Sequence, residues 1–331
     1  MAIGSERQGQ GGHERHGPSV AGPSGLASPA TGRGEEARPE TSGWLRRNPV
    51  VNGVRNMVFG DPVVPLRLQA LRALDRRFGL VRSCRRRLDY DLIERPHYGH
   101  CLLHAAALAR KLRHPRVSAI EFGVAGGNGL VALERHAEAV RAETGVEVAI
   151  FGFDTGRGMP PPRDYRDMPY MWQAGYFEMD EGALRARLRS ARLILGDVAE
   201  TLPGFAAREG PPPIGFIAIA FDLDYYSSTV EALRILEGDH RHLLPRVACY
   251  FDDTVGDLDW TYHEFAGELL AVKEFNAVHE RIKVAPVNGF RFWGRRVPRS
   301  WHEQVFVAHL FDHPDYGRPI SELTQIPLAA E

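Results

Sequence analysis

The chain has 331 residues, of which 44% are hydrophobic, so it is long enough to bury one large core or two modest ones. Its 41 basic and 42 acidic residues give a formal net charge of −1, which argues against a nucleic-acid-binding surface. The three cysteines are dispersed and form neither a disulfide framework nor a zinc motif. No apolar run approaches the roughly 20 residues that span a bilayer, and residues 1–40 contain no signal-peptide core. We therefore expect a cytoplasmic protein that binds neither nucleic acid nor a membrane.

The start of the chain differs in composition from the rest. Residues 1–43 are rich in Gly, Ser, Pro, Arg and Glu with almost no large apolar residues, so they are predicted to be a disordered tail. Residues 44–116 carry helical patterns, one of them beginning at Pro96, and form a predicted N-terminal helical extension. Residues 117–312 alternate strand and helix patterns as one ligand-binding domain, and residues 313–331 form a predicted C-terminal tail.

The most informative stretch opens the ligand-binding domain. Val117 to Phe122 is an apolar run that predicts a buried parallel strand, with Glu121 near its end. A turn with four glycines follows, and Leu130 then begins a helical pattern. A strand, a glycine-rich turn and a helix together bring backbone N–H groups to a ligand in open α/β sheets. We expect the ligand to lie against the four glycines of the turn: Gly123, Gly126, Gly127 and Gly129.

The glycines alone leave the identity of the nucleotide open. Gly127 to Ala132 fits the G-x-G-x-x-A form of the dinucleotide fingerprint, so NAD stays possible. The carboxylate of Glu121, however, opposes an anionic pyrophosphate and favours a ligand that carries an ammonium and a sulfonium group. The pattern E-x-G-x-x-G-G-x-G after a buried strand resembles the first motif of class I S-adenosylmethionine-dependent methyltransferases. The resemblance implies S-adenosylmethionine as the cofactor, with Glu121 and the glycines around its methionine part.

Further apolar runs predict a complete α/β sheet. Strands are expected over residues 146–153, 192–195, 214–221, 247–251, 282–287 and 305–311, with helical patterns between most of them. The alternation predicts a doubly wound, mostly parallel seven-stranded sheet of the Rossmann-like class, with the ligand at the carboxyl ends of the strands. Acidic residues follow the strands at that edge: Asp154, Asp197, Asp222, Asp224, Asp252 and Asp253.

The first two of these acidic residues are candidates for contacts with a nucleoside. Asp154 ends the second strand, where a carboxylate is placed to accept hydrogen bonds from ribose hydroxyls. Asp197 follows the third strand, where it could reach the adenine amino group. Capping of the next turn is the alternative for both residues. The segment between them, Gly156 to Asp180, is a long aromatic loop and is either a substrate lid or an interface.

The other four acidic residues predict a cation site. Asp222, Asp224, Asp252 and Asp253 would repel one another at neighbouring strand ends, and a divalent metal removes the conflict. Oxygen ligands suit Mg²⁺ or Mn²⁺, whereas non-haem iron would use two histidines and only His263 lies close in sequence. The alternative is that these carboxylates cap helices and face water.

Four segments, taken in their order along the chain, carry a second resemblance. Phe153 to Pro160, Leu195 to Pro203, Asp222 to Thr229 and Phe251 to Asp253 together resemble the macrocin O-methyltransferase (TylF/MycF-like) family, whose members are Mg²⁺-dependent and methylate sugar hydroxyls of macrolides. The resemblance covers roughly 117–254 and implies that Asp154 holds the ribose. It also implies that Asp222, Asp252 and Asp253 bind the metal.

The expected activity is in-line methyl transfer from S-adenosylmethionine to a hydroxyl of a small molecule of the sugar or secondary-metabolite class. The metal, held by Asp222, would bind the acceptor oxygen, and Asp224 or His263 would accept the proton of the acceptor hydroxyl. An NAD-binding oxidoreductase is the alternative, and it leaves the carboxylate cluster without a role. A hydroxylase-like or non-catalytic binding protein of the same fold also stays open, as does assembly into a homo-oligomer.

Overall fold

A computed structural model of the chain describes residues 66–220, 225–256, 258, 261–292 and 299–321. All of these fall in the unit Phe59–Glu331, to which this description applies. The predicted tail at residues 1–43 and the predicted site residues Asp222 and Asp224 lie outside the described residues. Among the helices that the structure describes, none has the length and apolar character needed to cross a membrane.

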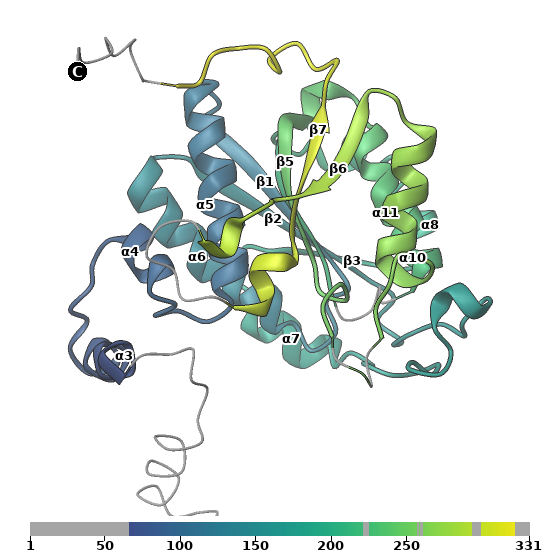
Figure 1. The fold of residues 1–331 in the computed structure, drawn as a ribbon, viewed down its shortest axis with the longest axis horizontal. Coiled ribbons are helices and arrows are strands. Elements are labelled where there is room, and N and C mark those ends of the chain that lie inside the picture. Colours follow the sequence, from purple (N-terminus) through teal and green to yellow (C-terminus); the bar gives the residue numbers. More distant parts are fainter. Residues whose placement is uncertain (1–65, 221–224, 257, 259–260, 293–298, 322–331) are drawn as a thin grey trace, which may run out of the picture. The chain divides into compact units, whose positions relative to one another are not determined.

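Within the described ranges, seven strands form one sheet in the order β3-β2-β1-β4-β5-β7-β6 (Figure 1). The first five strands run parallel, and β7 pairs antiparallel with both β5 and β6. This arrangement confirms the predicted doubly wound, mostly parallel fold. The strands are β1 (Arg116–Phe122), β2 (Glu147–Asp154), β3 (Arg192–Leu195), β4 (Ile214–Ile219), β5 (Leu243–Phe251), β6 (Ile282–Pro286) and β7 (Val305–Leu310).

The central strands are buried on both faces, which is why they read as unbroken apolar runs. All six residues of β4 are buried, as are six of the seven residues of β1. Phe216 and Ala218 of β4 belong to one core cluster, and Ile217 and Ile219 belong to the other. Successive side chains of a strand point to opposite faces, so each face of the sheet has its own core.

Helices cover both faces of the sheet. In Figure 1, α5 (Pro96–Lys111) and α6 (Asn128–Thr144) lie on one face, whereas α8 (Val198–Thr201), α10 (Tyr226–Leu233) and α11 (Gly267–Val278) lie on the other. Pro96 starts α5 as predicted, because proline tolerates the first helical position, where its missing N–H is not needed. The remaining helices are α3 (Leu66–Phe78), α4 (Cys84–Asp89), α7 (Glu181–Arg187) and α9 (Phe205–Glu209), with 3₁₀ turns η1 (Tyr165–Asp167), η2 (Arg234–Glu237), η3 (His240–His242), η4 (Phe290–Phe292) and η5 (Ser300–Glu303).

One strand boundary differs from its prediction for a physical reason. The strand β5 was expected at residues 247–251 but begins at Leu243 and passes through Pro245. Proline has no N–H to donate, so it is tolerated in a central strand only where the pairing is irregular. The β4–β5 register shifts at this place, between Ile214 and Phe216, and the proline is accommodated there.

The candidate site lies where the strand order reverses, between β1 and its neighbour β4. The carboxyl ends of these strands are linked by backbone hydrogen bonds, from Ala220 N–H to the carbonyl of Phe122 and from Asp252 N–H to the carbonyl of Ile219. The glycine-rich turn after β1 and the acidic pair after β5, Asp252 and Asp253, therefore share one edge of the sheet.

Candidate cofactor and cation site

The glycine-rich turn after β1 is shaped largely by packing within the protein. Gly127 has a φ of +75°, and a Cβ added there would lie 2.0 Å from Cδ1 of Leu184 in α7. A Cβ added at Gly129 would lie 1.7 Å from Oε1 of Glu121. A Cβ at Gly126, in contrast, would meet no atom within 4 Å. Gly127 and Gly129 thus leave room for the side chains of Leu184 and Glu121, whereas Gly126 faces open space.

Glu121 lies beneath this turn as a buried carboxylate that the described residues satisfy only in part. Glu121 is 1% exposed, and its Oε1 accepts a hydrogen bond of 2.7 Å from the hydroxyl of Tyr98 in α5. Oε2 is buried and has no hydrogen-bond partner among the described residues. Burial raises the pKa of Glu121 to about 7, although the Tyr98 hydrogen bond and the charge of Arg95 act to lower it. A ligand with a positive charge would satisfy this carboxylate.

Asp154 stabilises the turn from the end of β2. It is 5% exposed, and its Oδ2 accepts hydrogen bonds from the N–H groups of Val124 at 2.9 Å and Ala125 at 2.8 Å. Its Oδ1 accepts from the N–H of Gly156 at 2.5 Å. Ala125 has a φ of +47°, an unfavourable conformation for a residue with a Cβ, so the carboxylate holds a strained turn in place. The ribose contact of Asp154 stays a prediction beside this observed role.

Asp197 has the capping role that was weighed as its alternative. It is the N-cap residue of α8, and its Oδ1 accepts from the N–H of Ala199 at 2.8 Å on an exposed part of the surface. Contact with an adenine ring stays a prediction.

Sequence reasoning missed Arg187, which ends α7 and contacts the turn from the side. Its Nη1 donates to the carbonyl of Gly126 at 2.9 Å, and its Nη2 donates to Oδ1 of Asn128 at 2.7 Å. The only available signal was an arginine at the end of a short helix, which is more simply interpreted as a favourable charge at a helix C-terminus.

The acidic pair after β5 lines a cavity of about 850 Å³. The lining carries the two carboxylates Asp252 and Asp253 and the positively charged guanidinium of Arg95. Its other walls carry six rings: His97, Trp172, Phe177, Tyr250, Tyr262 and Trp301. His97 stacks on Tyr250, with ring centroids 4.3 Å apart, so these two rings form one continuous wall. Carboxylates surrounded by aromatic rings suit a small polar molecule that is held by its faces.

The two carboxylates of the pair have different surroundings. The hydroxyl of Tyr250 donates to Oδ1 of Asp252 at 2.7 Å, and burial raises the pKa of Asp252. The hydroxyl of Tyr262 donates to Oδ1 of Asp253 at 2.5 Å, while Oδ2 of Asp253 is buried with no hydrogen-bond partner among the described residues. A buried carboxylate oxygen without a hydrogen-bond partner is a suitable ligand for a hard cation such as Mg²⁺ or Mn²⁺.

The described residues do not contain a complete metal site. No three His, Cys, Asp or Glu side chains among them are close enough together to hold a metal ion. The predicted ligand Asp222 and the predicted proton acceptor Asp224 lie outside the described residues, so their contribution stays a prediction.

His263, the other predicted proton acceptor, is not brought to the cavity. Its side chain is exposed, its Nδ1 accepts from the N–H of Phe265 at 3.1 Å, and it is absent from the cavity lining. The reason lies in the local fold: α11 begins only at Gly267, so His263 belongs to an exposed turn that precedes the helix.

The aromatic loop after β2 supplies one wall of the cavity and is anchored to the fold. Its Met159 and Trp172 form a buried cluster with Tyr225, against which Phe177 packs. Asp167 is buried in η1, and its carboxylate accepts from the N–H of Ser227 at 2.9 Å and from the Ser227 hydroxyl at 3.1 Å. The first turn of α10 is therefore capped by Asp167, a residue of the loop.

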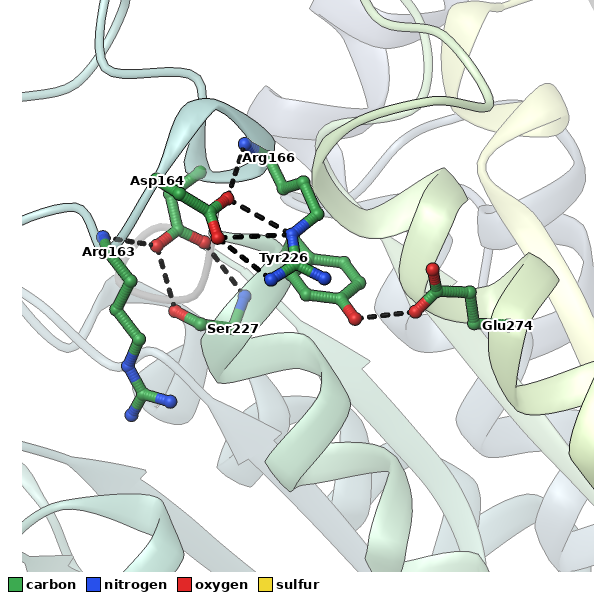
Figure 2. Close-up of polar contacts among 7 residues, drawn as sticks. Arg163, Asp164, Arg166, Tyr226, Ser227 and Glu274 are labelled. Atoms are coloured by element: carbon green, nitrogen blue, oxygen red, sulfur yellow. Dashed lines mark hydrogen bonds and ion pairs between the residues drawn. The ribbon is translucent and has the colours of Figure 1, made fainter.

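A second set of contacts links the same loop to α10 and, through Tyr226, to α11. Figure 2 shows the guanidinium of Arg166 over the ring of Tyr226, with 4.3 Å between Cζ and the ring centroid. The hydroxyl of Tyr226 donates to Oε2 of Glu274 at 2.5 Å, and Asp164 accepts from Arg166 on its other side. The loop wall of the cavity thus rests on two helices.

The sequence matches no protein-family model and no curated protein. Among solved structures, similarity is found to the calicheamicin methyltransferase CalS11, with 19% identity over 74% of this chain and 91% of that chain and a TM-score of 0.45. The O-methyltransferase NovP is 15% identical over 65% of this chain and 79% of that chain, with a TM-score of 0.44. The MycE methyltransferase, solved with Mg, SAH and mycinamycin VI, is 17% identical over 65% of this chain and 50% of that chain, with a TM-score of 0.36. With TM-scores below 0.5, these likenesses carry no conclusion about activity.

Proposed function

We propose that this protein is an S-adenosylmethionine-dependent O-methyltransferase that acts on a hydroxyl group of a small molecule with the help of a divalent cation, Mg²⁺ or Mn²⁺. The observation that carries the proposal is the buried Oε2 of Glu121, which has no hydrogen-bond partner among the described residues. It lies beneath the glycine-rich turn, at the point where the strand order reverses. A pyrophosphate at that turn would meet a like charge, whereas a cationic ligand would satisfy the carboxylate. This favours S-adenosylmethionine over NAD.

The residues of the turn fit the cofactor as follows. Glu121 offers its free oxygen to the positively charged methionine part, and Gly126 leaves the backbone open to close approach. Asp154 and Arg187 keep the turn in shape from either side. When bound, the cofactor supplies a methyl group on a sulfonium, which needs an oxygen nucleophile held in line with it.

The cavity beside the turn is the proposed acceptor site. Its rings would contact the faces of the acceptor and exclude water, and Asp252 and Asp253 would hold the cation, which would lower the pKa of the acceptor hydroxyl. The resemblance to the macrocin O-methyltransferase family supports a sugar or secondary-metabolite acceptor. Asp224 is the proposed proton acceptor, since His263 lies on an exposed turn. The balanced net charge supports partners other than nucleic acid or membranes.

Calorimetry with S-adenosylhomocysteine and with NAD tests the cofactor. We expect S-adenosylhomocysteine to bind and NAD to give no heat. Tight NAD binding without a response to S-adenosylhomocysteine would identify an oxidoreductase instead. Chelation with EDTA tests the cation separately: transfer activity should disappear and return with Mg²⁺, while S-adenosylhomocysteine binding persists.

A further inference from the structure

The helix α11 brings the carboxylate of Glu268 next to Asp253, one member of the acidic pair after β5. Glu268 lies in the first turn of α11, is 1% exposed, and its Oε2 accepts a hydrogen bond of 2.9 Å from the backbone N–H of Asp253. The residue before it, Gly267, has a φ of +58°, which turns the chain sharply into the helix and favours glycine there. The carboxylate of Glu268 is therefore held against Asp253 by its backbone and by the course of the chain.

Two oxygens of this carboxylate pair lack partners. Oε1 of Glu268 and Oδ2 of Asp253 are both shielded from water, and neither has a hydrogen-bond partner among the described residues. Buried polar atoms are nearly always satisfied, and a carboxylate left unsatisfied costs several kcal/mol. Two such oxygens on hydrogen-bonded residues suit a small positively charged partner.

Either a cation or a shared proton could supply that charge. A shared proton would join the two carboxylates as a neutral acid and its conjugate base and would bind no ligand. A divalent cation would be bound by both oxygens and would complete its shell with water, with the acceptor and with further protein oxygens. The cation is favoured because Asp252 and Asp253 also line the acceptor cavity, where Arg95 is the one arginine or lysine among the described lining residues. One arginine and one shared proton would leave the three carboxylates with an excess negative charge.

We propose that Glu268 is a ligand of the divalent cation, which it shares with Asp253. The identity of the cation rests on the proposed function, but ligation by Glu268 can be tested without any methyl transfer. Sequence reasoning assigned the metal to aspartates alone, and Glu268 adds a side chain from a different helix. The cation would thereby tie the N-terminus of α11 to the end of β5.

Isotope labelling of the wild-type protein gives a direct test. Protein grown with glutamate labelled by ¹³C at the carboxylate carbon is loaded with Mn²⁺ and studied by electron–nuclear double resonance. We expect a strong ¹³C coupling of the size found for directly bound carboxylates, because every other proposed protein ligand is an aspartate. Aspartate-labelled protein serves as the positive control. A coupling in the aspartate sample alone would overturn the proposal.

A variant series gives an independent readout of Mn²⁺ affinity by titration of the free-ion electron paramagnetic resonance signal. Glu268→Gln keeps the size of the side chain and should weaken Mn²⁺ binding at least tenfold, as should Asp253→Asn. Glu264→Gln is the matched control, since Glu264 is an exposed carboxylate near the start of the same helix that pairs with Lys273. Wild-type affinity in Glu268→Gln would mean a shared proton. Binding of S-adenosylhomocysteine, measured in parallel, shows that each variant is folded and tests the proposed function separately.

Discussion

Glu121→Gln should stabilise the protein without ligand and weaken cofactor binding. The reason is that the buried carboxylate destabilises the protein unless a positively charged ligand is bound. In the folded protein its pKa is raised to about 7, against a usual value of 4.5, chiefly by burial. A raised carboxyl pKa means that stability is fully present below pH 4.5 and is lost as the pH rises through about 7. At about 1.4 kcal/mol per unit, the difference amounts to a loss of roughly 3 kcal/mol above pH 7.

Glutamine removes the charge and keeps an oxygen that can accept the hydrogen bond from Tyr98. The effect of this bond on the charged carboxylate is already included in the shifted pKa, so the gain in unfolding free energy at pH 8 should be the full difference of roughly 3 kcal/mol. At pH 4 the wild-type side chain is itself neutral and the gain should vanish. The affinity for S-adenosylhomocysteine should fall about tenfold or more at pH 8, since a buried charge pair is lost.

Urea denaturation at pH 4 and pH 8 and calorimetry with S-adenosylhomocysteine measure both effects. Glu134→Gln is the control, because Glu134 on α6 is also buried but accepts hydrogen bonds from the N–H groups of Ser190, Ala191 and Arg189, which outweigh its burial and lower its pKa. That variant should be less stable than wild type at pH 8 and bind the ligand normally. The reasoning is refuted if Glu121→Gln is destabilised at pH 8 or binds S-adenosylhomocysteine as tightly as wild type.

Three other substitutions address the cation, the loop and the acceptor. Asp252→Asn should lose Mn²⁺ binding and activity but keep S-adenosylhomocysteine affinity, by calorimetry with each ligand; full activity in the presence of EDTA would contradict it. Asp167→Ala removes the cap of α10 and should lower the unfolding free energy by about 1 to 2 kcal/mol in a urea titration. The exposed Asp164→Ala should change that free energy much less than Asp167→Ala, and equal effects would show that the cap is unimportant. Trp172→Ala should raise the acceptor KM several-fold without changing cofactor affinity, and an unchanged KM would place the acceptor elsewhere.

The strands could be predicted from the sequence because their burial leaves a direct trace in it. Parallel strands covered on both faces need apolar side chains at nearly every position, so the run from Ile214 to Ile219 stands out from its polar flanks. The same reasoning failed at the start of β5, where Pro245 signals a break. What keeps the strand intact is the irregular pairing with β4, which depends on a partner some 30 residues away in sequence.

The supporting residues of the site could not be predicted, because each acts across a long stretch of sequence. Asp167 caps a helix 60 residues later, and Arg187 contacts a glycine 61 residues earlier. Glu268 is 15 residues from Asp253, and an acidic residue in a first helical turn is usually explained by the helix dipole alone. Nothing in their local patterns separates these three from ordinary surface charges, and only the folded chain shows that two of them are buried.

At the glycine-rich turn, the structure gives a packing reason for a glycine that the sequence pattern assigned to a ligand. Gly127 was expected to lie against the ligand, which makes Gly127→Val the obvious test of binding. Its missing Cβ instead makes room for Leu184, and the substitution would disrupt packing whether or not a ligand binds. Gly126→Ala is the informative change, because the added methyl group meets no protein atom and Gly126 needs no positive φ. Its melting temperature should equal that of wild type, and any loss of S-adenosylhomocysteine affinity would then report the ligand itself; unchanged affinity would remove Gly126 from the cofactor site.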